Sequence, residues 1–243
     1  MLALLQKEIK AFLSSLIGYI VIIVFLLLIG LIMWVFPTDM NVLNQGYASL
    51  ETLFNIAPWV FMFLIPAITM RFFSEEKRTG TIELLLTKPL TDLQIILSKY
   101  FAGLLLVLFS LIPTLFYFGT IYYLGSPVGN VDVGGTWGSY IGLLLLGGGF
   151  VSIGVFASSM ARNQVVAFII AVFLCFITYI GFDSLASLPV LGSIDHLIVK
   201  LGINEHYISI SRGVLDTRDL LYFLSLSAFF ILLTKLVLES RKW

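Results

Sequence analysis

Long apolar runs dominate this chain, and six of them approach the roughly 20 residues that a membrane-spanning helix needs. The six runs are residues 16–36, 52–70, 100–124, 137–160, 165–182 and 220–238. Composition agrees, because 59% of the residues are apolar and 12% are charged, against about 25% charged in a soluble domain. The pattern predicts an all-α integral membrane protein in which residues 1–243 form a single transmembrane domain.

Small residues and prolines distinguish some of these runs. The fourth run contains Gly138, Gly142, Gly148 and Ser152, which repeat a small-x-x-x-small spacing. Such a stripe lets another helix approach closely, so we expect these four residues to pack against a neighbour. The second and third runs contain prolines, and we expect kinks there. The prolines are Pro58, Pro66 and Pro113.

Basic residues are unevenly divided between the two sides of the membrane. Six spans put both termini on one side, and that side carries 11 Lys and Arg residues while the other carries 3. The larger group is Lys7, Lys10, Arg71, Lys77, Arg78, Lys88, Lys99, Arg162, Lys235, Arg241 and Lys242, and the smaller is Lys200, Arg212 and Arg218. The positive-inside rule therefore predicts cytoplasmic termini.

Several functions are disfavoured by what the spans lack. No ionisable residue falls in the middle of any run, which argues against a proton-coupled transporter or a channel with a charged ring. The single cysteine, Cys175, excludes a disulfide framework. His196 and His206 are ten residues apart without a third histidine, a poor pattern for a metal site. Net charge is zero, so nothing suggests a nucleic-acid partner.

The first 15 residues are amphipathic. Apolar and polar positions alternate at helical spacing, which predicts an interfacial helix lying on the membrane before the first span. The apolar face is Leu2, Leu5, Ile9, Phe12 and Leu16, and the polar face is Gln6, Lys7, Lys10 and Ser14. A simple basic topology signal is the alternative, and the two readings are compatible.

Residues 71–99 form a charged loop between the second and third runs. Gly80 interrupts the chain, Thr81 begins a short helix and Pro89 ends it. Thr91 and Gln94 have capping-box spacing, which predicts that a new helix starts there. A short cytoplasmic helix with apolar residues suits docking to a partner better than a solvated turn does.

Residues 183–219 form the last outer connection. Its apolar positions come in short sets interrupted by Gly202 and Gly213, too short to span a membrane. We expect an external helical hairpin of interfacial or re-entrant helices before the last span.

No catalytic or nucleotide-binding motif is found in the sequence. The phosphate-binding pattern G-x-x-x-x-G-K-[ST] has no match, and no span carries a base beside Ser152 that could serve a membrane hydrolase. The chain is therefore not expected to be an enzyme or to bind a cofactor itself.

The charged loop carries a motif that resembles the permeases of ABC-2 type transporters. It reads E-E-K-R-T-G-T-I-E-L-L-L-T-K-P over residues 75–89. The amphipathic start, six spans and outer hairpin resemble that family over essentially the whole chain. The stretch S-R-G-V-L-D-T-R-D at residues 211–219 resembles a subgroup that includes the permeases of the bacterial gliding-motility transporter and of the nitrous-oxide-reductase maturation cluster, the former most of all.

This resemblance implies a type V exporter-like permease in a bacterial inner membrane. Its partners would be a separate ABC ATPase, which binds ATP and Mg, and a second permease copy or homologue. The short helix would be the coupling helix, and residues 1–15 the connecting helix. The implied coupling residues are Glu75, Glu76, Arg78, Gly80, Thr81, Glu83, Leu84, Leu85 and Pro89.

Within that resemblance, Glu75, Glu76, Arg78 and Glu83 would pin the coupling helix by charge pairs. Leu84 and Leu85 would fill the ATPase groove, while Gly80 and Pro89 set the helix ends. The alternative function is a membrane scaffold that recruits a soluble partner through the same loop and transports nothing.

Overall fold

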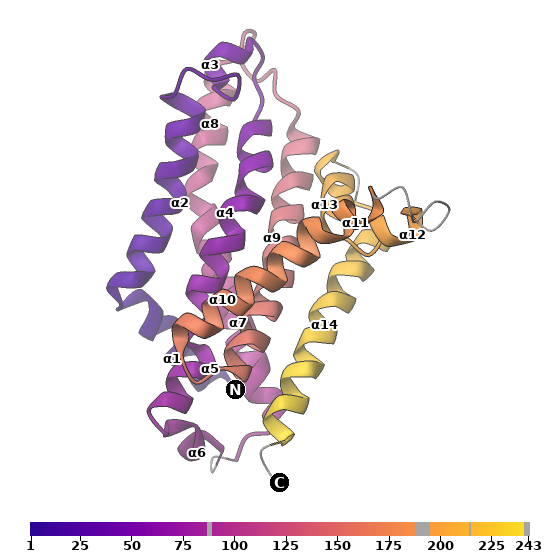
Figure 1. Ribbon diagram of the computed structural model, residues 1–243. Coiled ribbons are helices and arrows are strands. Elements are labelled where there is room, and N and C mark those ends of the chain that lie inside the picture. Colours follow the sequence, from indigo (N-terminus) through magenta and orange to yellow (C-terminus); the bar gives the residue numbers. More distant parts are fainter. Residues whose placement is uncertain (87–88, 188–194, 214, 241–243) are drawn as a thin grey trace.

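A computed structural model describes residues 1–86, 89–187, 195–213 and 215–240 as a helical bundle (Figure 1). The first half contains α1 (Leu2–Leu13), α2 (Leu16–Trp34), α3 (Val42–Gln45), α4 (Glu51–Thr69), α5 (Arg71–Arg78), α6 (Thr81–Leu86), α7 (Asp92–Leu111) and α8 (Leu115–Leu124). The second half contains α9 (Val133–Met160), α10 (Gln164–Phe176), α11 (Phe182–Ala186), α12 (Asp195–Val199), α13 (Ile203–Ser211) and α14 (Thr217–Glu239).

Five helices in the described residues are long and apolar enough to cross a membrane, and a sixth span is obtained if the bent pair of α1 and α2 is counted as one. The two members of that pair meet at 65°, so α1 runs across the line of α2. Ser15 caps α2 by accepting a hydrogen bond from the Gly18 amide at 3.2 Å. The described residues are thus all helical, with five to six helices that could cross a membrane, in agreement with the expected fold class.

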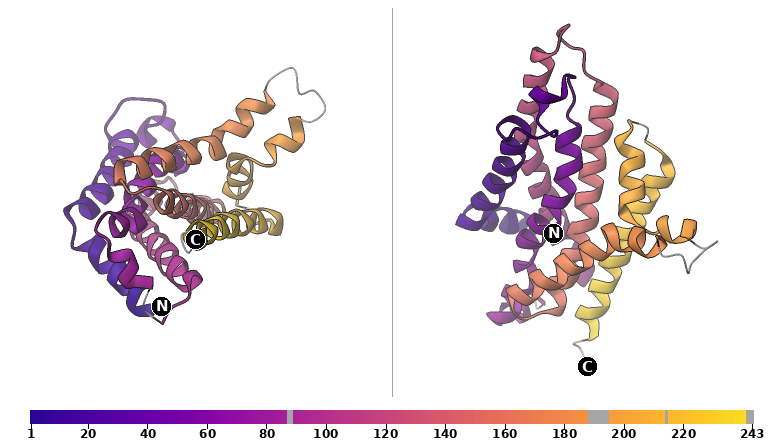
Figure 2. Two further views of the ribbon diagram at one scale, coloured as in Figure 1. Left: turned by 60° about the horizontal axis from the view of Figure 1, so that its bottom comes forward. Right: turned by 45° about the horizontal axis from the view of Figure 1, so that its top comes forward.

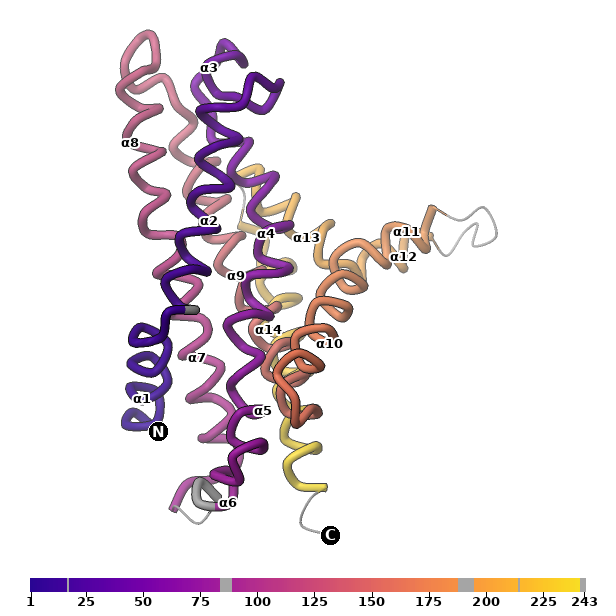
Figure 3. The backbone as a smooth tube through the Cα atoms, turned by 60° about the vertical axis from the view of Figure 1, so that its left-hand side comes forward, coloured from indigo at the N-terminus to yellow at the C-terminus, as the bar shows by residue number. Residues whose placement is uncertain are grey.

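Two helices that could cross a membrane are longer than a span requires, and both reach the end of the bundle that carries α6 (Figure 3). The helix Glu51–Arg78 has 28 residues and joins α4 to α5. At 1.5 Å per residue it is about 42 Å long, against a hydrocarbon core of about 30 Å. The stretch Asp92–Leu124 has 33 residues and changes to a 3-10 turn at Pro113, whereas α4 is uninterrupted at Pro58 and Pro66. Most of the expected loop, residues 71–99, is therefore helical, because α5 and the start of α7 extend into it, and only the short segment with α6 lies between them.

Helix α9 is the central element. It contacts α4, α5, α7, α10, α13 and α14, and the left view of Figure 2 shows it surrounded by other helices. A Cβ added at Gly138 would lie 2.7 Å from the Cα of Gly213, and one at Gly142 would lie 3.2 Å from Cγ2 of Ile210. The small residues of α9 therefore admit α13 and the turn after it.

The stripe continues at the other end of α9. A Cβ at Gly148 would lie 3.0 Å from the Tyr100 hydroxyl oxygen of α7, and the buried Ser152 donates its hydroxyl hydrogen bond to the Gly149 carbonyl. The small residues of α9 thus allow close packing of α13 near one end and of α7 farther along the helix.

The segment before the last span is more deeply integrated than an external hairpin. Helix α10 continues through a π-helical turn (Ile177–Gly181) into α11, which lies beside α12 at the side of the bundle (Figure 1). Helix α13 packs on α9, and the buried Tyr207 donates a 2.7 Å hydrogen bond to the Phe54 carbonyl of α4. Residues 188–194 of the expected hairpin lie outside the described part of the structure.

Candidate functional site: the α6 tip and the charges behind it

Helix α6 lies at the end of the bundle, at the tip of two helical arms, α5 on one side and α7 on the other. Gly80 has φ +72°, a left-handed conformation that disfavours side chains, and it turns the chain from α5 into α6. Thr79 supports the turn by donating to the Glu75 carbonyl at 2.9 Å, and its hydroxyl oxygen lies 3.0 Å from that of Thr81. On the far side, Thr91 and Gln94 form the expected capping box of α7.

The two sides of α6 differ in exposure. Ile82 is 9% exposed and belongs to the hydrophobic core, while Thr81, Glu83 and Pro89 are exposed. Glu83 makes no ion pair within the described residues. The backbone of Leu84 and Leu85 is helical, but their side chains, like residues 87 and 88, lie outside the described part of the structure.

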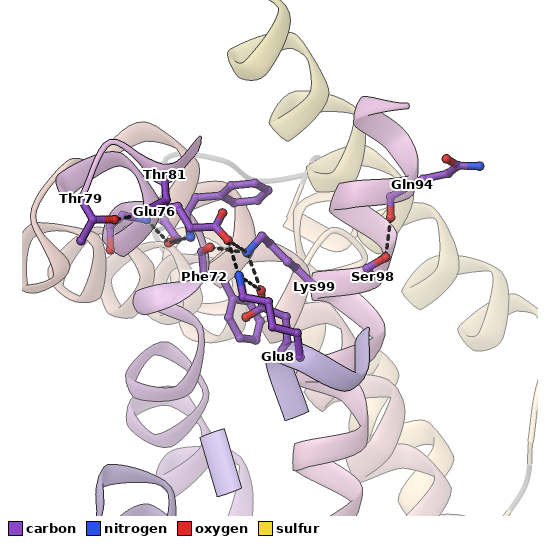
Figure 4. Close-up of polar contacts among 12 residues, drawn as sticks. Glu8, Phe72, Glu76, Thr79, Thr81, Gln94, Ser98 and Lys99 are labelled. Atoms are coloured by element: carbon purple, nitrogen blue, oxygen red, sulfur yellow. Dashed lines mark hydrogen bonds and ion pairs between the residues drawn. The ribbon is translucent and has the colours of Figure 1, made fainter. Parts of the chain in front are cut away.

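A buried cluster of charges joins the two arms behind α6 (Figure 4). The Nζ of Lys99, on α7, lies 2.9 Å from Glu8 Oε1 and 3.0 Å from Glu76 Oε1, and it donates to the Phe72 carbonyl at 2.6 Å. The Lys99 side chain is fully buried, and the Glu8 and Glu76 side chains are 11% and 10% exposed. Three elements (α1, α5 and α7) therefore converge on one ammonium group.

Ring faces complete the surroundings of this ammonium. Lys99 Nζ lies 5.0 Å from the centroid of Phe73 and 5.9 Å from that of Phe72, within range of a cation–π interaction. Removing such charges from water is costly unless each is paired and hydrogen-bonded. The cluster satisfies that condition for Lys99, so it fixes the positions of the three helices relative to one another.

Lys7 extends the cluster toward solvent. Its Nζ lies 3.1 Å from Glu76 Oε1 and 3.6 Å from Glu8 Oε1. Partial burial alone would lower the pKa of Lys7, but the nearby Glu8 and Glu76 carboxylates outweigh it and raise that pKa. Lys7 consequently stays positively charged at neutral pH and adds a second cation to the two acids.

The outer face of α5 connects to the turn between α9 and α10. Glu75 pairs with Arg78 at 2.7 Å and also accepts a hydrogen bond from Gln164, while Lys77 donates to the Ser159 carbonyl. The α6 tip is thus tied to the fifth span as well as to the second and third.

Ser158 of α9 supports the junction of α4 and α5. Its hydroxyl donates to the Met70 carbonyl at 2.9 Å and accepts from the amides of Phe73 and Ser74 at 2.9 and 3.1 Å. All three groups lie where the helix is interrupted at Met70. One buried hydroxyl therefore satisfies backbone groups that the interrupted helix leaves open.

The structure changes the role expected for Glu76. Its carboxylate points into the bundle toward Lys7 and Lys99, and its side chain is 10% exposed, so in this structure it is a member of the internal cluster. Glu75 and Arg78 are paired with each other at the surface. Of the acids in the motif, Glu83 is the one on α6 that faces outward.

Sequence reasoning missed Lys99, Glu8 and Ser158, although the first two leave a signal. Lys99 falls on the buried stripe of α7, at helical spacing from Ile95, Ile96, Ala102 and Leu106. Glu8 stands four residues from both Leu4 and Phe12, which are the buried positions of α1. Of the expected apolar face of residues 1–16, Phe12 is buried against the bundle, while Leu2 on α1 and Leu16 at the start of α2 are each 76% exposed.

Comparison with known proteins follows this geometry. The family model described as ABC-2 family transporter protein matches residues 2–238, nearly the whole chain. The chain belongs to the ABC-2 transporter family. A search of curated proteins finds no matching relative. Family membership makes this ABC-2 protein a membrane subunit of the permease kind, a class that works with an ABC ATPase and has no ATPase site of its own.

Among the described residues, no group of three or more His, Cys, Asp or Glu side chains could hold a metal ion. His206 of this ABC-2 protein instead lies 2.7 Å from Asp219, with its other ring nitrogen 3.0 Å from the Lys200 carbonyl. This histidine is therefore engaged in structural contacts between α13 and α14.

Proposed function

We propose that α6 is the coupling helix through which a separate ABC ATPase drives this permease. The observation that carries the proposal is the isolation of α6 at the tip of α5 and α7, with Glu83 exposed and Ile82 buried beneath it. A partner that binds α6 holds a short element mounted directly on two spans.

The charge cluster suggests how a movement of α6 would be transmitted to the spans. Lys99 ties α7 to α5 and α1, and Gln164 ties α5 to α10. Breaking a buried ion pair costs about 3–5 kcal/mol, so these elements move together more readily than they separate. Movement of α6 would therefore reorient the second and third spans and the interfacial helix as one body.

The remaining parts of the proposal follow from the family and from the sequence. ATP and Mg would bind the ATPase, and none of this chain's residues would hold them. Two permease copies or homologues would pair and export a cargo across a bacterial inner membrane, with α6 and both termini in the cytoplasm on the positive-inside count. A role in gliding motility rests on the resemblance of residues 211–219 alone.

The test is coupling of the purified complex in a lipid bilayer. We expect Glu83→Ala and Leu84→Asp to weaken co-purification of the ATPase or to reduce transport-linked ATP hydrolysis several-fold. Asp39→Ala is the matched control, because Asp39 is an exposed acid in the turn between α2 and α3, and α3 lies at the end of the bundle away from α6. Full assembly and coupling in both α6 variants would overturn the coupling role.

The scaffold alternative makes a different prediction in the same experiment. A scaffold would lose its partner in the α6 variants, yet ATP hydrolysis by the wild-type complex would not respond to the presence of the permease. Stimulation of hydrolysis by the wild-type permease would therefore exclude it.

A further inference from the structure

A small cavity opens between α1 and the junction of α4 with α5. It has a volume of about 190 Å³, and its walls include Lys7, Glu8, Arg71, Glu75 and Glu76. Pockets for drug-sized molecules hold about 300 Å³ or more. The space is therefore suited to a small charged group and is too large for a single ion.

Two opposite charges in this cavity lack complete partners. Glu76 is 8% exposed, and its Oε1 is shared by Lys7 and Lys99, but its Oε2 is buried without a hydrogen-bond partner. The guanidinium of Arg71 makes no hydrogen bond or ion pair within the described residues. Buried polar atoms are almost always satisfied, so the open Glu76 oxygen calls for a donor. Arg71, half-buried on the wall of the same cavity, offers a cation to an anion, and together the two suit a zwitterionic group.

The cavity also has apolar walls. Phe12, Ile68 and Phe72 line it together with the charged residues. Helix α1 is amphipathic and is bent by 65° from the first span, the arrangement of a helix that lies along a membrane surface. A ligand with a charged head and an apolar tail fits this combination.

We propose that the cavity binds the phosphoethanolamine headgroup of a membrane lipid from the leaflet on the α6 side. The ammonium would donate to Glu76 Oε2, whose carboxylate can turn about its soft terminal torsion. The phosphate would lie against Arg71 and Lys7, and the acyl chains would leave the mouth of the cavity into the bilayer. The lipid would thus complete the charge cluster that joins α1, α5 and α7.

The chemistry of the cavity favours an ethanolamine headgroup over a choline or a glycerol headgroup. A choline headgroup has no N–H to donate to Glu76 Oε2 and is bulkier than an ethanolamine. A glycerol headgroup would satisfy Arg71 but would leave the Glu76 oxygen facing a net negative lipid. This proposal does not depend on the coupling role of α6, so the two can fail separately.

The first test uses the wild-type full-length protein, delipidated in detergent and titrated with single lipids in native mass spectrometry. The lipids are dioleoyl phosphatidylethanolamine, its N-methyl and N,N-dimethyl derivatives, dioleoyl phosphatidylcholine and dioleoyl phosphatidylglycerol. We expect affinity to fall stepwise with each methyl group, by at least about tenfold from ethanolamine to choline. Equal affinity across the methylation series, or tightest binding of the glycerol lipid, would overturn the proposal.

The second test uses variants to show whether the lipid binds in this cavity. Arg71→Gln removes a cation without breaking a contact of the folded chain, and we expect at least about tenfold weaker binding of the ethanolamine lipid. Glu76→Gln should abolish the preference for ethanolamine over choline. Arg78→Gln is the matched control, since Arg78 is on the same helix outside the cavity and should leave both lipids unaffected. Unchanged binding in Arg71→Gln would place any bound lipid elsewhere and overturn the assignment, even if Glu76→Gln fails to fold.

Discussion

The ammonium of Lys99 lies 3.0 Å from the Oε1 of Glu76, inside the bundle and 23 positions away along the chain. This pair joins the start of the third span to the extension of the second, on either side of α6. The short helix is consequently held by a closed structure whose two arms cannot separate without exposing or orphaning a charge.

Replacing Lys99 should therefore destabilise the protein strongly. Lys99→Met keeps most of the side-chain volume but leaves Glu8 and Glu76 buried without their main cation. We expect a loss of about 3–5 kcal/mol, seen as a lower midpoint of thermal unfolding in detergent. Lys10→Met, at an exposed position of α1, should leave the midpoint unchanged.

A double variant distinguishes the contribution of the Lys99 charge from the contribution of its side-chain packing. Adding Glu76→Gln to Lys99→Met removes one of the orphaned acids and should restore part of the lost stability, so the two changes are not additive. Strict additivity would show that Lys99 acts through its alkyl chain and not through its charge.

Ser158→Ala tests the support of the α4–α5 junction. The substitution removes the acceptor of the buried Phe73 and Ser74 amides, while the Met70 carbonyl keeps its hydrogen bond from the Ser74 hydroxyl. Leaving buried groups unsatisfied costs about 1–3 kcal/mol, and we expect the thermal midpoint to fall accordingly. Ser225→Ala removes an exposed hydroxyl of α14 that bonds its own helix, and no measurable change is expected there. Equal midpoints for the two variants would contradict the role assigned to Ser158.

Gly138→Ala tests the packing of α13 on α9. Its Cβ would lie 2.7 Å from the Cα of Gly213, so the backbone of the turn after α13 must shift. Overpacking of this kind costs about 1–3 kcal/mol. Gly119→Ala is the control, because nothing lies within 4 Å of a Cβ on that α8 residue and alanine favours the helix. Thermal midpoints that fall for Gly138→Ala and hold or rise for Gly119→Ala would agree with this packing; the same result for both would contradict it.

Local chemistry made much of the α6 region predictable from the sequence. Gly80 adopts its left-handed turn, α6 begins at Thr81, and Thr91 caps α7 with Gln94, because each of these features depends on residues within a few positions of one another. The change to a 3-10 turn at Pro113 depends on local chemistry in the same way. The family motif in this loop added the coupling role, which the residues alone do not specify.

The charge cluster could not be predicted in this way. Glu76 looked like one of several exposed loop acids, since a run of charges in sequence gives no sign of which member turns inward. Its partners Glu8 and Lys99 lie on helices far away in the chain, and each has only a weak signal, a charged residue on an apolar stripe.

By itself the sequence determined that this is a multi-pass helical membrane protein, where its helices begin and break near α6, and which family it resembles. Those properties follow from hydropathy, turn chemistry and capping, which act over short distances along the chain. Only the tertiary structure decided that the arms of α6 are joined by Lys99, that α9 is the centre around which α13 packs, and that Glu76 and Arg71 meet at one cavity. These depend on the low dielectric of the interior and on close packing, which are set by neighbours that the folded chain brings together and the linear order of residues does not reveal.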